Sequence, residues 1–277
     1  MISVIISFYK ALDNLELMLS ALQQQSFQDF EVIIAEDDNA QQTIDFLQME
    51  KTKFHFPILH ISQEDKGFRK CKILNKAIEI ASGDKIVFLD GDCLPHRHLL
   101  KHYNETINEG IYCIGRRVML SQKLSKKLKE TKNPVYTSFI ACLMNGVENE
   151  LKHALYLPWI KENKGNKRGI LGCNMGGYKS DLLAVNGFDE DYQLPAVGED
   201  SDLEWRLRSC RISIKSVFYK CITYHLHHRQ SHDGNSMEQI NNRDMMEIKR
   251  KAGYCFCSNG IKKNVSPKCK INGAGNA

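Results

Sequence analysis

The chain has 277 residues, of which 42% are hydrophobic and 26% are charged, and its formal net charge is +5 at pH 7. This length is enough for one large domain or one domain with appendages, and the composition is that of a globular protein rather than a disordered or fibrous one. The small net charge argues against a nucleic-acid-binding protein.

The sequence contains no apolar stretch of membrane-spanning length, and residues 1–7 lack the basic start of a signal peptide. We therefore expect a cytoplasmic protein. Lysines are concentrated in segments 123–132 and 262–270. Such runs are typical of a solvated surface, and a peripheral contact with the anionic inner face of the plasma membrane is the alternative.

The ten cysteines show no framework spacing, which is typical of reduced thiols in a core. Cys255, Cys257 and Cys269 form the pattern of a zinc site that lacks one ligand pair.

Strand and helix patterns alternate three times before an Asp-Gly-Asp motif. The expected strands are 2–8, 30–35, 56–61 and 84–90, and the apolar residues of segments 12–22, 43–47 and 68–81 recur at helical spacing. This order predicts a Rossmann-like, mostly parallel sheet flanked by helices.

The last of these strands ends in two acids separated by one glycine, Asp90-Gly91-Asp92. Side chains alternate along a strand, so both carboxylates point to the same side, at most about 7 Å apart. Two carboxylates this close repel each other, and a divalent cation that carries a phosphorylated ligand removes the repulsion. A solvated acidic turn is the alternative.

The second half begins with a strand-like segment, and its other expected elements are less regular. They are a strand at 111–120, a basic helix or loop at 121–131, an apolar helix at 136–147, a turn-rich insert at 163–169, a strand at 216–226 and an exposed helix at 236–252. The glycine-rich run 172–177 indicates either close approach of the backbone to a ligand or a plain turn.

A further helix is expected from residue 199, because Leu203 and Leu207 lie four residues apart. Glu199 and Asp200 then lie at its N-terminus, where the helix dipole favours ionised carboxylates. Asp202 and Arg206, one turn apart, are expected to form a structural ion pair.

These motifs, taken in order, resemble the family 2 glycosyltransferases, which are inverting nucleotide-sugar enzymes with a GT-A fold. The resemblance covers roughly residues 2–230. It implies a nucleotide-sugar-binding half at 1–110 and an acceptor-binding and catalytic half at 111–230 of the same domain, followed by a C-terminal helical extension and tail at 231–277.

The resemblance also implies the donor site. Its residues are the opening turn Ser7, Phe8 and Tyr9, the acidic pair Glu36 and Asp37 that reads uracil, the helix motif with Gly67, Arg69, Lys70 and Asn75, and the residues Asp90, Gly91 and Asp92.

A galactosyltransferase-like second half is implied by Cys173-Asn174-Met175 and by segments 187–190, 198–207 and 224–228. We expect Asp200 to act as the general base, on the face opposite the leaving group, and Asn174 and Glu199 to contact the acceptor. Asp92 and His225, with His228 as the second choice of histidine, are expected to hold Mn²⁺ or Mg²⁺; an imidazole ligand favours manganese.

One departure from the family concerns the acceptor. The family has an aromatic residue where this chain has Ala196, so the aromatic platform for the acceptor sugar is missing there. Trp159 and Trp205 are the candidates to replace it.

The expected function is transfer of a hexose or N-acetylhexosamine from a nucleotide sugar, with UDP as the expected nucleotide. The resemblance implies as acceptor a hydroxyl of a saccharide or lipid-linked saccharide in bacterial surface polysaccharide or lipopolysaccharide synthesis. A non-catalytic sugar-nucleotide or glycan-binding module on the same fold is one alternative. A haloacid-dehalogenase-type phosphatase is the other, but its motif stands on the first strand and continues into Thr or Val, whereas Cys93 and Leu94 follow here.

Overall fold

The computed structural model describes residues 1–134, 137–161, 163–164, 169–195, 198–228 and 237–265. In this part of the chain a mixed sheet of eight strands forms the centre, in the order β3-β2-β1-β4-β9-β6-β10-β8. The strands are β1 (Ile2–Phe8), β2 (Phe30–Glu36), β3 (Ile58–Ser62), β4 (Lys85–Asp90), β6 (Ile111–Ile114), β8 (Asn163–Lys164), β9 (Asn174–Tyr178) and β10 (Ser213–Ser216).

The first four strands are parallel, as the sequence predicts. β1 pairs with β2 on one side and β4 on the other, so that Ser7 is in register with both Ala35 and Asp90. The carboxyl ends of these strands, with the acids that follow them, therefore meet at one edge of the sheet, where open α/β sheets bind ligands.

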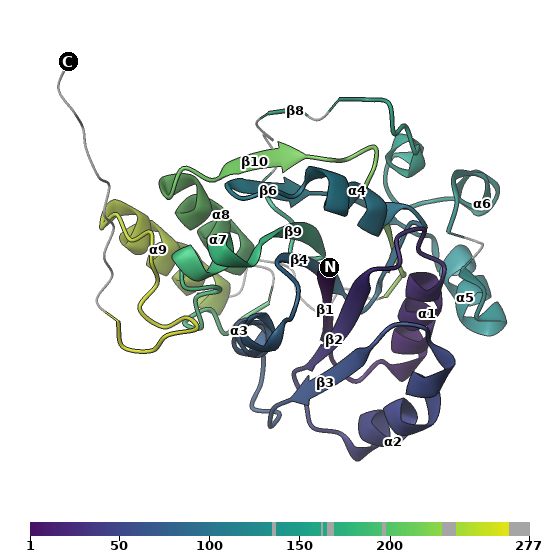
Figure 1. Cartoon of the computed structure of the whole chain (residues 1–277), viewed down its shortest axis with the longest axis horizontal. Helices are drawn as coiled ribbons and strands as arrows, with labels where there is room; N and C mark the ends of the chain where they lie inside the picture. The colour runs from purple at the N-terminus through teal and green to yellow at the C-terminus, as the bar shows by residue number, and fades with distance from the viewer. Residues whose placement is uncertain (135–136, 162, 165–168, 196–197, 229–236, 266–277) are drawn as a thin grey trace.

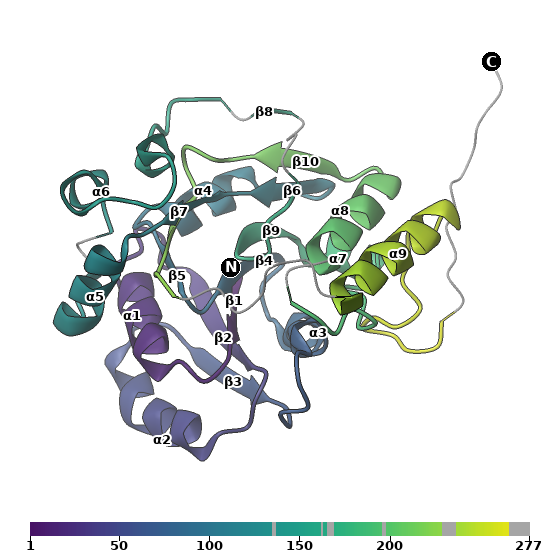
Figure 2. The same ribbon diagram turned by 180° about the vertical axis from the view of Figure 1, so that it is seen from behind.

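Helices cover both faces of the large sheet (Figures 1 and 2). They are α1 (Leu12–Gln23), α2 (Gln41–Glu50), α3 (Lys70–Ile80), α4 (Leu99–Thr106), α5 (Gln122–Thr131), α6 (Phe139–Asn145), α7 (Lys179–Ala184), α8 (Glu199–Ser209) and α9 (Met237–Lys251), with short 3-10 turns at Lys51–Lys53 and Leu151–Ala154. None of the described helices combines the length and the apolar character that crossing a bilayer requires.

Alternation along β1 divides the core between the two faces. Val4 and Ile6 belong to the cluster that contains residues of α1, α4 and α5, whereas Ile5 belongs to the cluster with residues of α3 and α8. A strand that is covered on both faces has apolar side chains on both faces. The sequence of β1 is therefore almost continuously apolar.

A second, smaller sheet lies beside the first one. It has the order β5-β11-β7, with β5 (Cys93–Pro95), β7 (Arg116–Met119) and β11 (Ile222–His225). β11 is antiparallel to β5, with His225 opposite Cys93, and parallel to β7. This pairing brings the histidine-rich segment next to Asp92.

Two predicted strands are wrong in extent because each one is split between the sheets. Segment 111–120 divides at Gly115 into β6 and β7, and segment 216–226 contains only the end of β10 and, after a turn, β11. A Cβ at Gly115 would lie 2.3 Å from Asn174 Nδ2, so only glycine fits where the chain leaves the large sheet.

The C-terminal extension packs against the loop before α8. The Lys249 ammonium lies 2.6 Å from Asp189 Oδ2 and 2.7 Å from Asp191 Oδ2, and Asn186 donates hydrogen bonds to the backbone oxygens of Cys257 and Lys262. Cys255 is disulfide-bonded. Its thiol is therefore neither reduced nor free to bind zinc, and both expectations are wrong for this residue. Cys269 lies outside the described residues.

Candidate active site

A cavity of about 930 Å³ opens at the carboxyl ends of β1 and β4. Thirteen of the residues singled out from the sequence line it: Ser7, Phe8, Tyr9, Asp37, Gly67, Lys70, Asp90, Gly91, Asp92, Glu199, Asp200, His225 and His228. The acids after β4, the helix start at residue 199 and the late histidines, which are far apart in sequence, therefore share one cavity.

Asp90 is held by two donors from different elements. Ser7 Oγ donates a hydrogen bond of 2.6 Å to Asp90 Oδ1, and the ammonium of Lys70, in the first turn of α3, lies 2.5 Å from the same oxygen. Burial alone would lower the pKa of Lys70, but the carboxylates of Asp90, Asp200 and Glu199 outweigh it and raise the pKa. Lys70 therefore stays protonated and contributes a fixed positive charge to the cavity.

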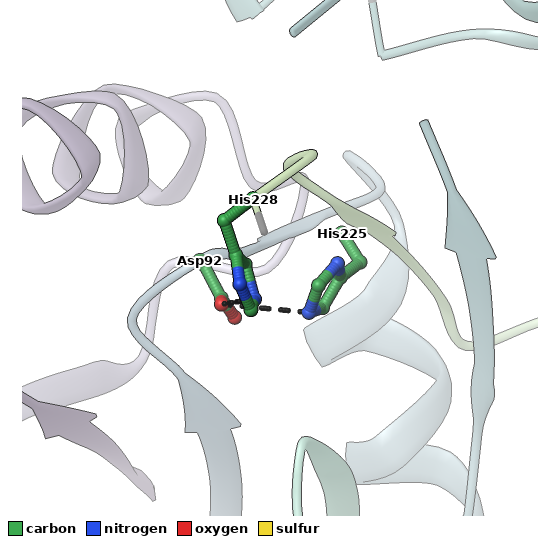
Figure 3. Close-up of side chains that lie close together, drawn as sticks. All are labelled: Asp92, His225 and His228. Carbon is green, nitrogen blue, oxygen red and sulfur yellow. Dashed lines mark ion pairs between the residues drawn. The ribbon is translucent and has the colours of Figure 1, made fainter. Parts of the chain in front are cut away.

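Asp92, His225 and His228 form a cluster with three potential metal ligands (Figure 3). Asp92 Oδ2 lies 3.4 Å from His225 Nε2 and 3.1 Å from His228 Nε2, and all three ligand atoms are within 4.8 Å of one another. Both histidines that the sequence offered as alternatives thus join the same cluster, since the chain turns back immediately after β11 and brings His228 over Asp92.

The protonation of this cluster suits a divalent cation. Burial raises the pKa of Asp92, but His228 and His225 outweigh it and lower the pKa to about 2. Burial lowers the pKa of His225, despite the opposing effect of Asp92, so its imidazole is neutral near pH 7. One carboxylate and two imidazoles are a donor set that suits Mn²⁺ and other first-row divalent ions.

Glu199 and Asp200 begin α8, as predicted. Gly198 precedes the helix with a φ of +105°, a conformation that glycine adopts without strain. Asp200 Oδ2 accepts a 2.6 Å hydrogen bond from the backbone N–H of Gly172. Burial raises the pKa of Asp200, while Lys70 opposes this shift; burial and the neighbouring Asp200 raise the pKa of Glu199 to about 7. The predicted pair of Asp202 and Arg206 is confirmed, with 2.7 Å between Oδ2 and Nε, both side chains being buried.

Four predicted site residues do not line the cavity. Glu36 is completely buried and binds Thr43 and His60 through its carboxylate, and the Arg69 guanidinium donates to the backbone oxygen of Glu64. Arg69 instead contributes its backbone N–H, which donates a 2.7 Å hydrogen bond to Asp37 Oδ2.

The predicted direct contacts of Asn75 and Asn174 are contradicted by their burial. Asn75 is 2% exposed. Its side-chain amide donates a hydrogen bond to the backbone oxygen of Phe188 and accepts one from the backbone N–H of the same residue. Asn174 is completely buried; it accepts a hydrogen bond from the Tyr103 hydroxyl and donates to the backbone oxygens of Arg116 and Cys221. Both amides therefore position backbone segments rather than substrate.

The structure adds Arg117 to the site. This β7 residue lines the cavity with its side chain partly buried. The pKa of Arg117 is raised overall. Burial lowers it, but the neighbouring Cys173, Cys93, Asp90 and Asp92 outweigh the effect of burial. No pattern in the sequence distinguishes Arg117 from Arg116, whose guanidinium lies over the Phe218 ring.

The wall expected to carry an aromatic acceptor platform contains Gln193, Leu194 and Pro195. Ala196 lies outside the described residues. Neither Trp159, which is 75% exposed, nor Trp205 lines the cavity. The two tryptophans therefore do not supply that platform in this structure.

Comparison with known families identifies the chain. The sequence model described as "Glycosyl transferase family 2" matches residues 3–178, which is more than half of the chain. The chain belongs to this family. The phosphatase alternative thereby loses its support, and the glycosyltransferase resemblance inferred from the sequence is confirmed.

A curated relative of this family 2 glycosyltransferase is the glycosyltransferase AglE of Haloferax volcanii, which is 29% identical over 120 residues. These residues make up 42% of this chain and 39% of AglE. The chain thus spans about two fifths of that relative.

Solved glycosyltransferases share the GT-A fold of this chain. GalNAc-T7 with UDP, GalNAc and Mn²⁺ has a TM-score of 0.64 at 10% identity, with coverage of 91% of this chain and 49% of GalNAc-T7. S. aureus TarS in complex with UDP-GlcNAc has a TM-score of 0.62 at 15% identity, covering 90% of this chain and 66% of that one. The mannosyltransferase PcManGT of Pyrobaculum calidifontis, with GDP-Man and Mn²⁺, has a TM-score of 0.55 at 14% identity, and the match covers 90% of this chain and 69% of PcManGT.

Proposed function

We propose that this glycosyltransferase transfers a hexose or N-acetylhexosamine from a UDP-sugar to a hydroxyl of a saccharide or lipid-linked saccharide, with inversion at the anomeric carbon. One observation carries the proposal. The cluster of Asp92, His225 and His228, the Lys70–Asp90 ion pair and the half-buried Asp200 all border the same cavity.

The donor diphosphate lies, in this proposal, beside the cluster of Asp92, His225 and His228. These residues would hold Mn²⁺ or Mg²⁺, which when bound acts as a Lewis acid towards the departing diphosphate. Lys70 and Arg117 add positive charge on the same side, and Asp90, oriented by Ser7 and Lys70, contacts the ribose. Structures of TarS with UDP-GlcNAc and of PcManGT with GDP-Man and Mn²⁺ support a sugar-nucleotide donor.

Asp200 is the proposed general base. It takes the proton of the acceptor hydroxyl while that oxygen forms its bond to the anomeric carbon and the diphosphate leaves. The raised pKa makes Asp200 a better proton acceptor than an exposed aspartate, and the Gly172 N–H orients its carboxylate. A single displacement with one base inverts the anomeric carbon. Glu199 binds acceptor hydroxyls beside it.

The acceptor belongs, in this proposal, to the synthesis of a bacterial surface polysaccharide or lipopolysaccharide. The wall of Gln193, Leu194 and Pro195 borders the same cavity as Glu199.

The purified protein tests the proposal when it is incubated with a panel of UDP- and GDP-sugars, with Mn²⁺ and with Mn²⁺ removed by a chelator. We expect release of nucleoside diphosphate from one donor class, dependent on the cation, and NMR of the product should show the inverted anomer. Nucleotide affinity without donor consumption, under all of these conditions and with saccharide acceptors present, would instead identify a non-catalytic binding module.

A further inference from the structure

The short helix α6 presents an apolar surface to solvent at a distance from the cavity. Ile140, Leu143 and Met144 are 67%, 59% and 76% exposed, whereas Ala141 and Cys142 on the other side of the helix are buried in the core. We call these three exposed residues the apolar patch. Single exposed apolar side chains are ordinary, but three within five positions of a helix without any charged residue indicate an interaction surface.

The neighbouring helix α5 is strongly basic. It contains Lys123, Lys126, Lys127 and Lys129 against one acid, Glu130, so four positive charges minus one negative charge give it +3. Leu124 and Leu128 face the core, which leaves Lys123, Lys126 and Lys129 exposed. The ion pair of Lys126 with Glu130, at 3.7 Å and on the surface, is weak.

The two helices that carry the apolar patch and the lysines are neighbours. α5 and α6 pack against each other at one edge of the molecule (Figure 1). Ser121, the N-cap of α5, donates a 2.8 Å hydrogen bond to the backbone oxygen of Asn145 at the end of α6. Two adjoining helices therefore carry the exposed apolar side chains and the exposed lysines, and together they form the candidate docking surface.

We propose that this surface docks on an anionic phospholipid bilayer. Lysine ammonium groups are attracted to lipid phosphates, and the apolar patch can enter the boundary between headgroups and acyl chains. The combination favours a bilayer over a protein, because the apolar patch carries no polar group that would fix a specific partner and the charge of the adjacent helix is predominantly positive. Three apolar side chains alone would bind weakly, so the lysines are required as the second attraction.

The docking surface is coupled rigidly to the site. The backbone N–H of His227 donates a 2.8 Å hydrogen bond to Ser125 Oγ of α5, and the N–H of Leu120 donates to the backbone oxygen of His225. Docking would thus hold the strand that carries His225 at a fixed position relative to the bilayer. Delivery of a lipid-linked acceptor to the cavity follows only if the proposed function is correct, whereas bilayer binding does not depend on it.

Vesicle co-sedimentation of the full chain tests the inference. We expect binding to vesicles of phosphatidylcholine with phosphatidylglycerol and loss of this binding at high salt or with phosphatidylcholine alone. The double variants Ile140→Ser/Met144→Ser and Lys123→Glu/Lys129→Glu should each bind about tenfold more weakly or less.

Matched controls lie on other helices. Met49 and Ile248 are each 67% exposed, so Met49→Ser/Ile248→Ser removes a similar apolar exposure elsewhere. Lys51→Glu/Lys53→Glu, after α2, reverses the same number of charges. Both control variants should bind vesicles like the unmodified protein.

Three outcomes would overturn the inference. They are a lack of binding to anionic vesicles, equal binding to neutral vesicles, and test variants that bind as well as the controls. Self-association that the patch variants abolish, without vesicle binding, would assign the surface to a second copy of the chain. If vesicle binding follows the expected pattern while no donor is consumed, the docking surface stands and the proposed function fails.

Discussion

The backbone N–H of Gly172 donates a 2.6 Å hydrogen bond to Asp200 Oδ2, across 28 positions of sequence. Gly172 begins the glycine-rich run 172–177, most of which forms β9, and Asp200 belongs to the first turn of α8. A Cβ at position 172 would lie 2.6 Å from Asp200 Oδ1 and 2.9 Å from Oδ2. The glycine therefore permits the contact that orients the proposed base.

Gly172→Ala should lower turnover while the protein keeps its nucleotide affinity. The added methyl group displaces the Asp200 carboxylate, and a displacement on the order of 1 Å costs about a hundredfold in rate. Steady-state kinetics together with UDP titration calorimetry measure the two effects separately. Unchanged turnover would show that the orientation of Asp200 is not needed.

Asp200→Asn should lower turnover by about a hundredfold or more, because it removes the proton acceptor and keeps the shape of the side chain. The amide oxygen can still accept the hydrogen bond of Gly172, so folding and UDP affinity should be unchanged. Donor consumption and thermal unfolding of the same preparation provide the measurement and its control. Near-normal turnover would remove Asp200 from the proposed role.

His225→Ala and His228→Ala should each weaken Mn²⁺-dependent UDP binding by about tenfold or more. Both imidazoles belong to the cluster around Asp92. His227 is the matched control, because it lies between them in sequence but its ring binds Glu148. UDP titrations with and without Mn²⁺ would contradict the metal assignment if His227→Ala had the same effect as the other two variants.

Arg117→Met should weaken donor binding by about tenfold, because a partly buried cation beside Asp90 and Asp92 is lost. Arg116→Met, the neighbouring change on the same strand, serves as control, since Arg116 lies over Phe218 instead. The donor KM values of the two variants measure this difference. Equal KM values would show that Arg117 has no specific role in donor binding.

Glu199→Gln should change the pH dependence of stability. Burial and Asp200 raise the pKa of Glu199 from 4.5 to about 7, so the carboxyl is easier to bury protonated than ionised. Its contribution to stability is complete below about pH 4.5 and is lost as the pH rises through about 7. The variant should therefore be more stable than the unmodified protein at pH 8, by up to about 3 kcal/mol, and this advantage should shrink towards pH 5.

Urea unfolding of both proteins at these two pH values measures the difference. An advantage of equal size at pH 5 and pH 8 would show that Glu199 titrates normally in the folded protein.

Much of the fold follows from local patterns. The apolar runs of β1, β2 and β4 and the helical spacing before and after them specify a parallel sheet, because both periodicities are set by backbone geometry within a few residues. The split of segment 111–120 was not predictable from local patterns. β6 lies in the large sheet because it pairs with β9, and β7 lies in the small sheet because it pairs with β11.

The sequence by itself identified the acids at the end of β4, the helix start at Glu199 and the histidines at the end of β11, because each is a compact local motif. Only the tertiary structure decided which polar side chains reach the cavity. Asn75 and Asn174 make their hydrogen bonds with buried backbone, whereas Arg117 lines the same cavity as Asp90 and Asp92. The physical reason is that burial and pairing depend on residues brought together from distant parts of the chain, which no local pattern records.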